Sequence, residues 1–234
     1  MKRSFINQTV ELAKQIFQQH GFYLPKFAHY SLQDWQQLNL ADNQEIIDAR
    51  LGWDITDFNL GCFEQYGLTL FTLRNRTLSD SKSTNKPYAE KIMLVQEGQI
   101  TPMHYHWYKM EDIINRGGGN LILSLYQRDE ITDLIDKTKD IMVAIDGEKR
   151  MIKAGGLVKL APGQSICLPP HLYHSFWAEE GYVVAGEVSM ANDDMTDNRF
   201  LQNLGRFSDI EEDESAKYLL CSDYTHYFKQ GVKQ

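Results

Sequence analysis

The sequence has no long hydrophobic run, little cysteine and no excess of positive charge. No stretch approaches the roughly 20 continuous apolar residues that a membrane-spanning helix needs. The first fifteen residues, MKRSFINQTVELAKQ, turn polar at once instead of forming the apolar core of a signal peptide. Lys and Arg number 24 against 32 Asp and Glu, and the net charge of -8 argues against a nucleic-acid-binding surface. We therefore expect a soluble, cytoplasmic protein with no nucleic-acid or membrane partner.

Cysteine is scarce, and its distribution excludes two kinds of site. The three cysteines, Cys62, Cys167 and Cys221, are widely separated and form no Cys-x-x-Cys pair. Structural zinc sites and dithiol redox sites are commonly built on such pairs, so we expect ordinary reduced thiols.

The sequence also lacks internal repeats and any proline- or serine-rich linker, and 42% of its 234 residues are hydrophobic. These features favour a single domain with one sizeable core.

The pattern of apolar residues in the sequence changes near residue 66. Residues 1–66 are predicted to form a helical extension, because apolar residues recur there at helical spacing: Ile6, Val10, Ala13 and Phe17. Residues 67–200 consist of short apolar runs separated by turn residues, such as GLTLFTLRN and KIMLVQEG, and Asp146-Gly147 is a strong hairpin signal. The runs are too closely spaced for helical crossovers. We therefore expect a mainly β protein, an antiparallel β-barrel on which the N-terminal helices pack.

Residues 201–234 are predicted to form a C-terminal tail of the same domain. The tail contains the acidic run DIEEDES, which we expect to be a solvated segment. The segment KYLLCSDYTHYF after it is expected to be helical or irregular.

Two histidines and a glutamate form the most informative constellation. If residues 103–107 form a strand, His104 and His106 point to the same face, because side chains alternate along a strand. Glu111 follows after a short turn and can fold back over the same pocket. Two imidazoles and one carboxylate suit a divalent first-row metal and leave positions open for water or substrate. An isolated His-x-His is as often an ordinary strand feature, and the glutamate and flanking glycines favour the metal interpretation.

A second cluster supplies two candidates for a fourth ligand. Two prolines, Pro169 and Pro170, precede His171 and His174, and such prolines suit a turn that aims a following histidine inward. Either histidine would complete a set of three imidazoles and one carboxylate.

Both clusters resemble the sequence motifs of the cupin superfamily. The first motif is matched at every position by Gly98-x5-His104-x-His106-x4-Glu111-x6-Gly118. The second is matched by PPHLYH, with His171 in place of the usual glycine, in a register that makes His174 the fourth ligand and leaves His171 as the alternative. Three longer segments within residues 52–200 are similar to the D-lyxose isomerase family: GWDITDFNLGCFEQYGLTLFTLRN, PYAEKIMLVQEGQITPMHYHWYKMEDIINRGGGNL and GEVSMANDDMTDNRF.

This resemblance implies a cupin jelly roll with a defined activity. The resemblance implies a manganese-dependent aldose–ketose isomerase that interconverts D-lyxose and D-xylulose. Members of the family often also act on D-mannose and D-fructose, and the resemblance implies a homodimer. The ligand set is also suited to Co²⁺, Ni²⁺, Fe²⁺ or Zn²⁺, so the metal identity stays open.

An isomerase also needs a group that moves a proton, and Glu187 is our candidate. It lies in the apolar run VVAGEVSM beside Gly186, which permits a close approach. Its alternative role is a salt-bridged residue at the barrel mouth. Lys91 is a candidate for catalysis and for orienting sugar hydroxyls or the oxyanion, although a lysine at a strand edge is more often a solvated residue. A single metal site with a free carboxylate favours proton transfer through an enediol over hydride transfer.

Four further residues are candidates for sugar binding. Asp194 and Arg199 lie in the polar segment NDDMTDNR, which offers dense hydrogen-bonding groups but also has the composition of an ordinary turn. Trp107 and Tyr108 would wall the sugar pocket, although aromatic residues in a barrel are usually core.

Two other functions compete with the isomerase. A cupin dioxygenase would hold iron at the same four ligands, because this fold hosts many chemistries. A non-catalytic sugar-binding cupin is disfavoured, since the ligand set is intact.

Overall fold

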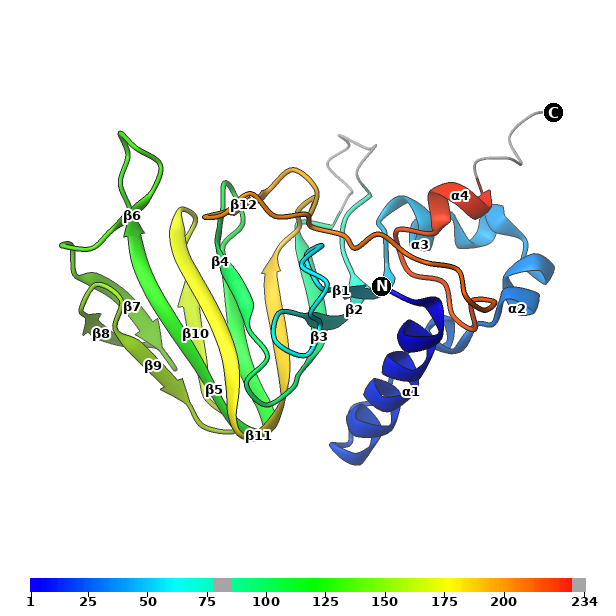
Figure 1. Cartoon of the computed structure of the whole chain (residues 1–234), viewed down its shortest axis with the longest axis horizontal. Coiled ribbons are helices and arrows are strands. Elements are labelled where there is room, and N and C mark those ends of the chain that lie inside the picture. The colour runs from blue at the N-terminus through cyan, green and yellow to red at the C-terminus, as the bar shows by residue number, and fades with distance from the viewer. Residues whose placement is uncertain (78–85, 229–234) are drawn as a thin grey trace.

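The computed structural model describes residues 1–77 and 86–228. Figure 1 shows a curved assembly of strands on one side and a group of helices on the other, joined by β1 to β3. Residues 229–234, the end of the predicted tail, lie outside the described residues. In the described part of the chain, no helix is long and apolar enough to cross a membrane.

The longest helix packs on the strands through its apolar face. Helix α1 (Arg3–Gln19) buries Ile6, Val10, Ala13 and Phe17, which confirms the face that the spacing predicted. The Phe17 ring stacks on Trp53 with centroids 6.4 Å apart. The remaining helices of the described residues are short: 3-10 turns at Lys26–His29 and Leu40–Asn43, α2 (Leu32–Gln37), α3 (Gln44–Asp48) and α4 (Tyr224–Phe228).

The described strands form one continuous antiparallel network. They are β1 (Gly52–Thr56), β2 (Leu68–Arg74), β3 (Tyr88–Val95), β4 (Thr101–His106), β5 (Glu111–Arg128), β6 (Ile135–Asp136), β7 (Ile141–Ile145), β8 (Glu148–Ile152), β9 (Leu157–Leu160), β10 (Ser165–Leu168), β11 (Leu172–Met190) and β12 (Asn198–Phe200). Strand β1 pairs with β2 at the edge of the sheet. The range 1–66 therefore contains one strand in addition to the helices expected there.

Two long strands pass from one wall of the barrel to the other. The order β1-β2-β3-β11-β5-β10-β7-β8 forms one wall, while β4 and β12 join the first half of β11, and β6 and β9 join the second half of β5. The strands bend where β5 contains consecutive glycines and the pairing register shifts. At Gly118, φ is +95° and an added Cβ would lie 2.1 Å from the Tyr182 carbonyl oxygen, so only glycine fits this bend.

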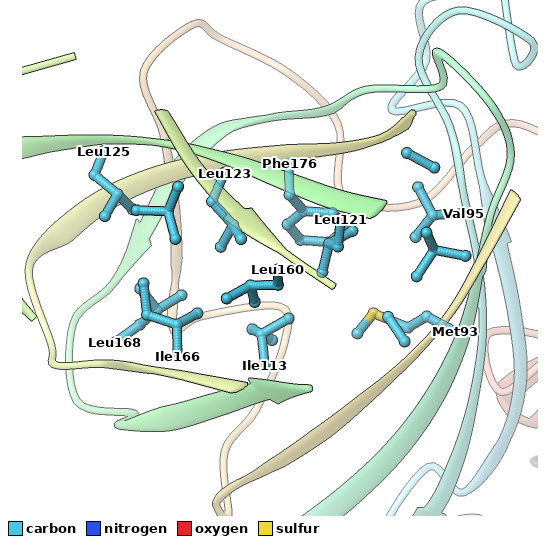
Figure 2. Close-up of a cluster of buried hydrophobic side chains, with 14 of the residues drawn as sticks. Met93, Val95, Ile113, Leu121, Leu123, Leu125, Leu160, Ile166, Leu168 and Phe176 are labelled. Atoms are coloured by element: carbon cyan, nitrogen blue, oxygen red, sulfur yellow. The ribbon is translucent and has the colours of Figure 1, made fainter. Parts of the chain in front are cut away.

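The barrel interior holds the main hydrophobic core. Leu, Ile, Val, Phe and Met side chains from both walls point into it and are almost fully buried (Figure 2). A second cluster lies between α1 and the outer face of β1 to β3, where Trp53 and Phe71 are buried. This core borders a pocket that charged side chains also line, because Phe58, Met93 and Phe200 belong to both.

The acidic residues of the run DIEEDES are exposed to solvent, as expected, and some of them also contact the start of α1. Glu212 accepts two hydrogen bonds from Arg3, whose side chain is completely buried, and Asp213 accepts from the Ser4 amide and hydroxyl groups. These contacts were not predicted, because the basic and polar groups at the start of α1 lie close to the run in space but more than 200 residues away in sequence.

Candidate active site

Three histidines converge inside the barrel. His104 and His106 lie on β4 and point to the same face, and His174 on β11 pairs directly with His104 across the ladder. One ring nitrogen from each lies within 4.8 Å of the others, and all three side chains are buried. The structure thus brings together the three imidazoles that the sequence predicted.

Backbone carbonyls fix the orientation of two of the rings. The Nδ1 atoms of His104 and His174 lie 2.7 Å from the Pro102 carbonyl oxygen and 2.9 Å from the Leu172 carbonyl oxygen. A carbonyl oxygen can only accept, so Nδ1 carries the proton in each ring and Nε2 keeps its lone pair. Burial also lowers the pKa of His104 well below its ordinary value, with the neighbouring imidazoles acting in the same direction. The His104 ring is therefore held neutral, as a metal ligand must be.

Glu111, the first residue of β5, completes the cluster. Its Oε1 atom lies 3.2 Å from His106 Nε2 and 3.1 Å from His174 Nε2, but it makes no hydrogen bond. Burial would raise the pKa of Glu111, but the charge of Lys109, with Nζ 2.7 Å from Oε2, outweighs this effect and holds the pKa well below its ordinary value. A buried carboxylate and imidazole nitrogens thus face one another, and this donor set fits a divalent cation.

His171 takes no part in this cluster. It has a left-handed backbone with φ of +64°, at the position where cupins usually carry glycine. Its ring lies 5.6 Å from the rings of Tyr105 and Trp107, outside the histidine cluster. Of the two candidates, the structure therefore brings His174, and not His171, beside the other histidines.

The carboxylate of Glu187 faces the same pocket from β11. Its Oε1 atom accepts from Lys109 Nζ and from Ser189 Oγ, both at 2.8 Å, and lies 3.4 Å from Lys91 Nζ. Burial raises the pKa of Glu187, but the charges of Lys109 and Lys91 outweigh it, so the pKa lies below its ordinary value. The carboxylate is therefore ionised at neutral pH.

Beyond Glu187, further buried side chains of opposite charge pair with one another. Lys91 Nζ donates to both carboxylate oxygens of Asp194 at 3.0 Å, and Arg206 Nη2 lies 3.2 Å from Asp194 and 2.7 Å from Asp54. Burial raises the pKa of Asp194, but Lys91 and Arg206 outweigh it and hold the pKa well below its ordinary value. These charged side chains therefore hold one another in fixed positions.

One pocket contains this whole set. It is lined by the three histidines, both glutamates, the charged residues Lys91, Lys109, Asp194 and Arg206, the amide of Asn198, and an apolar wall that includes Phe58, Met93 and Phe200. Sequence reasoning missed Lys109 and Arg206. Lys109 lies between the predicted ligands His106 and Glu111, and this position is the one sequence signal that could have identified it. Nothing in the sequence distinguishes Arg206.

Three predicted binding residues lie elsewhere. Trp107, Tyr108 and Arg199 do not line this pocket. Tyr108 is 78% exposed, the Trp107 ring packs on Tyr105, and Arg199 pairs with Asp133.

The fold and the pocket together define the class: a cupin-type β-barrel with a buried cluster of three histidines that could hold a metal ion, beside two ionised carboxylates. A family model described as D-lyxose isomerase matches residues 1–224. The chain belongs to this D-lyxose isomerase family and is a sugar isomerase.

Curated relatives agree with this assignment over nearly the whole chain. A D-lyxose/D-mannose isomerase from Escherichia coli O157:H7 is 52% identical over 229 residues, which cover 97% of this chain and all of the relative. A protein of the same name from Serratia proteamaculans is 50% identical, covering 97% of this chain and 99% of the relative. The isomerase hypothesis is thus favoured over the dioxygenase alternative.

Solved structures share the fold at low sequence identity. The L-ribose isomerase of Cellulomonas parahominis with L-psicose has a TM-score of 0.59 and 12% identity, covering 90% of this chain and 98% of that one. The L-ribose isomerase of Acinetobacter sp. DL28 with L-ribose has a TM-score of 0.56 and 14% identity, covering 89% and 98%. These likenesses confirm the expected cupin-type barrel.

Proposed function

We propose that this sugar isomerase interconverts D-lyxose and D-xylulose, and also D-mannose and D-fructose, by proton transfer through an enediol. The observation that carries the mechanism is the ionised carboxylate of Glu187, fixed by Lys109 and Ser189 in the pocket that holds the histidine cluster. The two D-lyxose/D-mannose isomerases that are 52% and 50% identical to this chain support the choice of sugars.

His104, His106, Glu111 and His174 are proposed to hold a divalent cation, with Mn²⁺ as the first choice. Co²⁺, Ni²⁺, Fe²⁺ and Zn²⁺ suit the same donors. When bound, the cation acts as a Lewis acid on neighbouring sugar oxygens and as a template for their orientation.

Glu187 is proposed to carry the proton between C1 and C2. Among the described residues, every hydrogen bond and ion pair of this carboxylate reaches Oε1, so we assign Oε2 as the atom that takes and returns the proton. Lys91, held by Asp194, is the proposed donor to sugar hydroxyl and oxyanion groups. Trp107, Tyr108 and Arg199 remain proposed binding residues outside this pocket.

The test is an activity assay on metal-stripped protein resupplied with Mn²⁺. D-Lyxose, D-mannose, D-xylose and L-ribose are compared, and the first two are expected to be converted. Glu187→Gln should lower kcat by about 10²- to 10⁴-fold, because the amide cannot accept the proton, while Mn²⁺ binding is retained. His104→Ala should lose metal binding. Turnover in heavy water should place deuterium at C2 of the aldose product in the ketose-to-aldose direction.

No conversion of any aldose despite stoichiometric metal binding would contradict the proposal. An aldose product that carries no solvent deuterium at C2 would contradict the enediol path.

We further propose that the protein is a cytoplasmic homodimer. The outer face of β11 and its neighbours carries half-exposed apolar side chains, including Met110, Val188 and Met190. On the adjacent β5, Asp112 and Arg116 are both exposed and flank Ile114, so two copies of this strand related by a two-fold axis would pair opposite charges.

A further inference from the structure

Asp133 lies behind the histidine cluster, on the faces of β4 and β11 that point away from it. The hydroxyl group of Tyr105 donates to Asp133 Oδ1 at 2.7 Å, and that of Tyr173 donates to the Asp133 carbonyl oxygen at 2.8 Å. On β4, Tyr105 stands between two histidines of the cluster, and on β11 Tyr173 directly precedes the third. One residue thus contacts both ligand-bearing strands.

Two arginines extend this connection to the adjoining strands. Arg128, at the end of β5, donates through Nε to Asp133 Oδ1 at 2.7 Å, and Arg199 on β12 donates through Nε to Oδ2 at 3.0 Å. Arg199 is also the ladder partner of Tyr105. The carboxylate therefore ties together β4, β5 and β12, and the carbonyl oxygen adds β11.

The loop that carries Asp133 is preset by its own hydrogen bonds. The Asp129 carboxylate accepts from the amides of Ile131 and Thr132, both at 2.9 Å, and the Asp129 carbonyl accepts from the Asp133 amide at 2.9 Å. Asp133 itself has a left-handed backbone with φ of +60°, which Asp and Asn tolerate better than most residues. The loop therefore presents the carboxylate at a fixed position.

The two tyrosines fix β4 and β11 relative to this loop. Both side chains are completely buried, and their rings meet edge to face with centroids 4.8 Å apart. A buried hydroxyl that loses its partner is costly, so the rings follow the loop. Because strand neighbours are covalently linked, a shift of Tyr105 or Tyr173 moves the adjacent histidines.

We propose that Asp133 is a positioning residue of the histidine cluster. It contacts neither metal nor substrate, and acts through Tyr105 and Tyr173 to hold β4 and β11 so that the imidazole nitrogens converge. This inference rests on the proposed metal-dependent function.

The test measures the Kd for Mn²⁺ by equilibrium dialysis and the Tm of the metal-free protein. Asp133→Asn keeps the backbone conformation but removes the charge, and should raise the Kd about tenfold, as losses outside the ligand set commonly do. The metal-free Tm should stay close to that of the unaltered protein, because the ion pairs lost are partly exposed. Asp140→Asn, at an exposed ion pair with Lys153, is the matched control and should change neither quantity.

Tyr105→Phe provides a second, independent variant. It removes only the hydroxyl group, so it should fold and raise the Kd in the same direction. Combining it with Asp133→Asn should cost less than the sum of the two effects, because Asp133→Asn weakens the same hydrogen bond that Tyr105→Phe removes.

Two results would overturn the inference alone: both variants binding Mn²⁺ as tightly as the unaltered protein, or a fall in metal-free Tm with no change in Kd. An unaltered protein that binds no Mn²⁺ would overturn the metal-dependent function and this inference with it.

Discussion

Lys109 is the residue on which the balance of charge in the pocket depends. Its Nζ atom lies 2.7 Å from Glu111 and 2.8 Å from Glu187, and its side chain is almost fully buried. Burial lowers the pKa of a lysine, but the two carboxylates outweigh this effect and raise the pKa of Lys109 above its ordinary value. The ammonium group therefore stays charged and keeps two buried carboxylates ionised.

Replacing Lys109 by methionine should destabilise the metal-free protein by about 3–5 kcal/mol, since two buried carboxylates lose their common partner. The free energy of unfolding in urea measures this loss. Lys149→Met, on the exposed strand β8, is the control and should change stability by less than about 0.5 kcal/mol. Equal stabilities of the two variants would contradict the role of Lys109.

At the scale of elements, the C-terminal segment stabilises the first helix. Arg3 is buried at the start of α1 and forms ion pairs with Glu212 and Asp223. The neighbouring Asp213 accepts from Ser4. The tail therefore supplies the partners of the helix start, and the helix supplies the tail with a docking surface.

This contact predicts a dependence of stability on pH. The hydrogen bond from Arg3 lowers the pKa of Glu212, and that from Ser4 lowers the pKa of Asp213. Carboxyl groups with a lower pKa in the folded state stabilise it above their unfolded pKa of about 4, and this contribution is lost as the pH falls through the folded pKa. The free energy of unfolding should thus decrease below about pH 4.

Urea unfolding between pH 3 and pH 7 measures this decrease. Glu212→Gln should flatten the acid slope, because its amide does not titrate, whereas Glu148→Gln at an exposed hairpin should keep the slope of the unaltered protein. An unchanged slope in Glu212→Gln would count against the contact as its source.

The local elements differ in how far the sequence predicted them. The hairpin at Asp146-Gly147 is confirmed between β7 and β8, with φ of +50° and +82° at the two residues, because the turn chemistry is local. Strand β1 was not predicted. Its pairing with β2 across an intervening loop, and its burial under α1, are tertiary effects.

At the scale of the whole molecule, the exposed apolar side chains of the outer sheet face require an explanation. Tyr88 and Met190 are ladder partners and are 47% and 52% exposed, and Val188 nearby is 44% exposed. Contiguous exposed apolar groups of this kind mark interaction surfaces.

If this face joins two copies, Val188→Glu should convert the protein from dimer to monomer, because it places a new charge beside Asp112 in the interface. Light scattering after size-exclusion chromatography measures the mass. Leu157→Glu, at an exposed site on β9, is the control and should leave the dimer intact. A dimeric Val188→Glu protein, or a monomeric unaltered one, would contradict the proposed face.

The sequence by itself determined the barrel class, the face of α1 and the four candidate ligands, because strand alternation, helical spacing and motif spacing are local properties of the chain. The motif register favoured His174 over His171, and the tertiary structure brings His174, and not His171, beside the other histidines. It also brought Lys109 between two glutamates and Arg206 beside Asp194, and it placed Trp107, Tyr108 and Arg199 outside the pocket. The contacts of Lys109 with Glu187 and of Arg206 with Asp54 join residues distant in sequence, and burial and charge pairing across the folded barrel fix them.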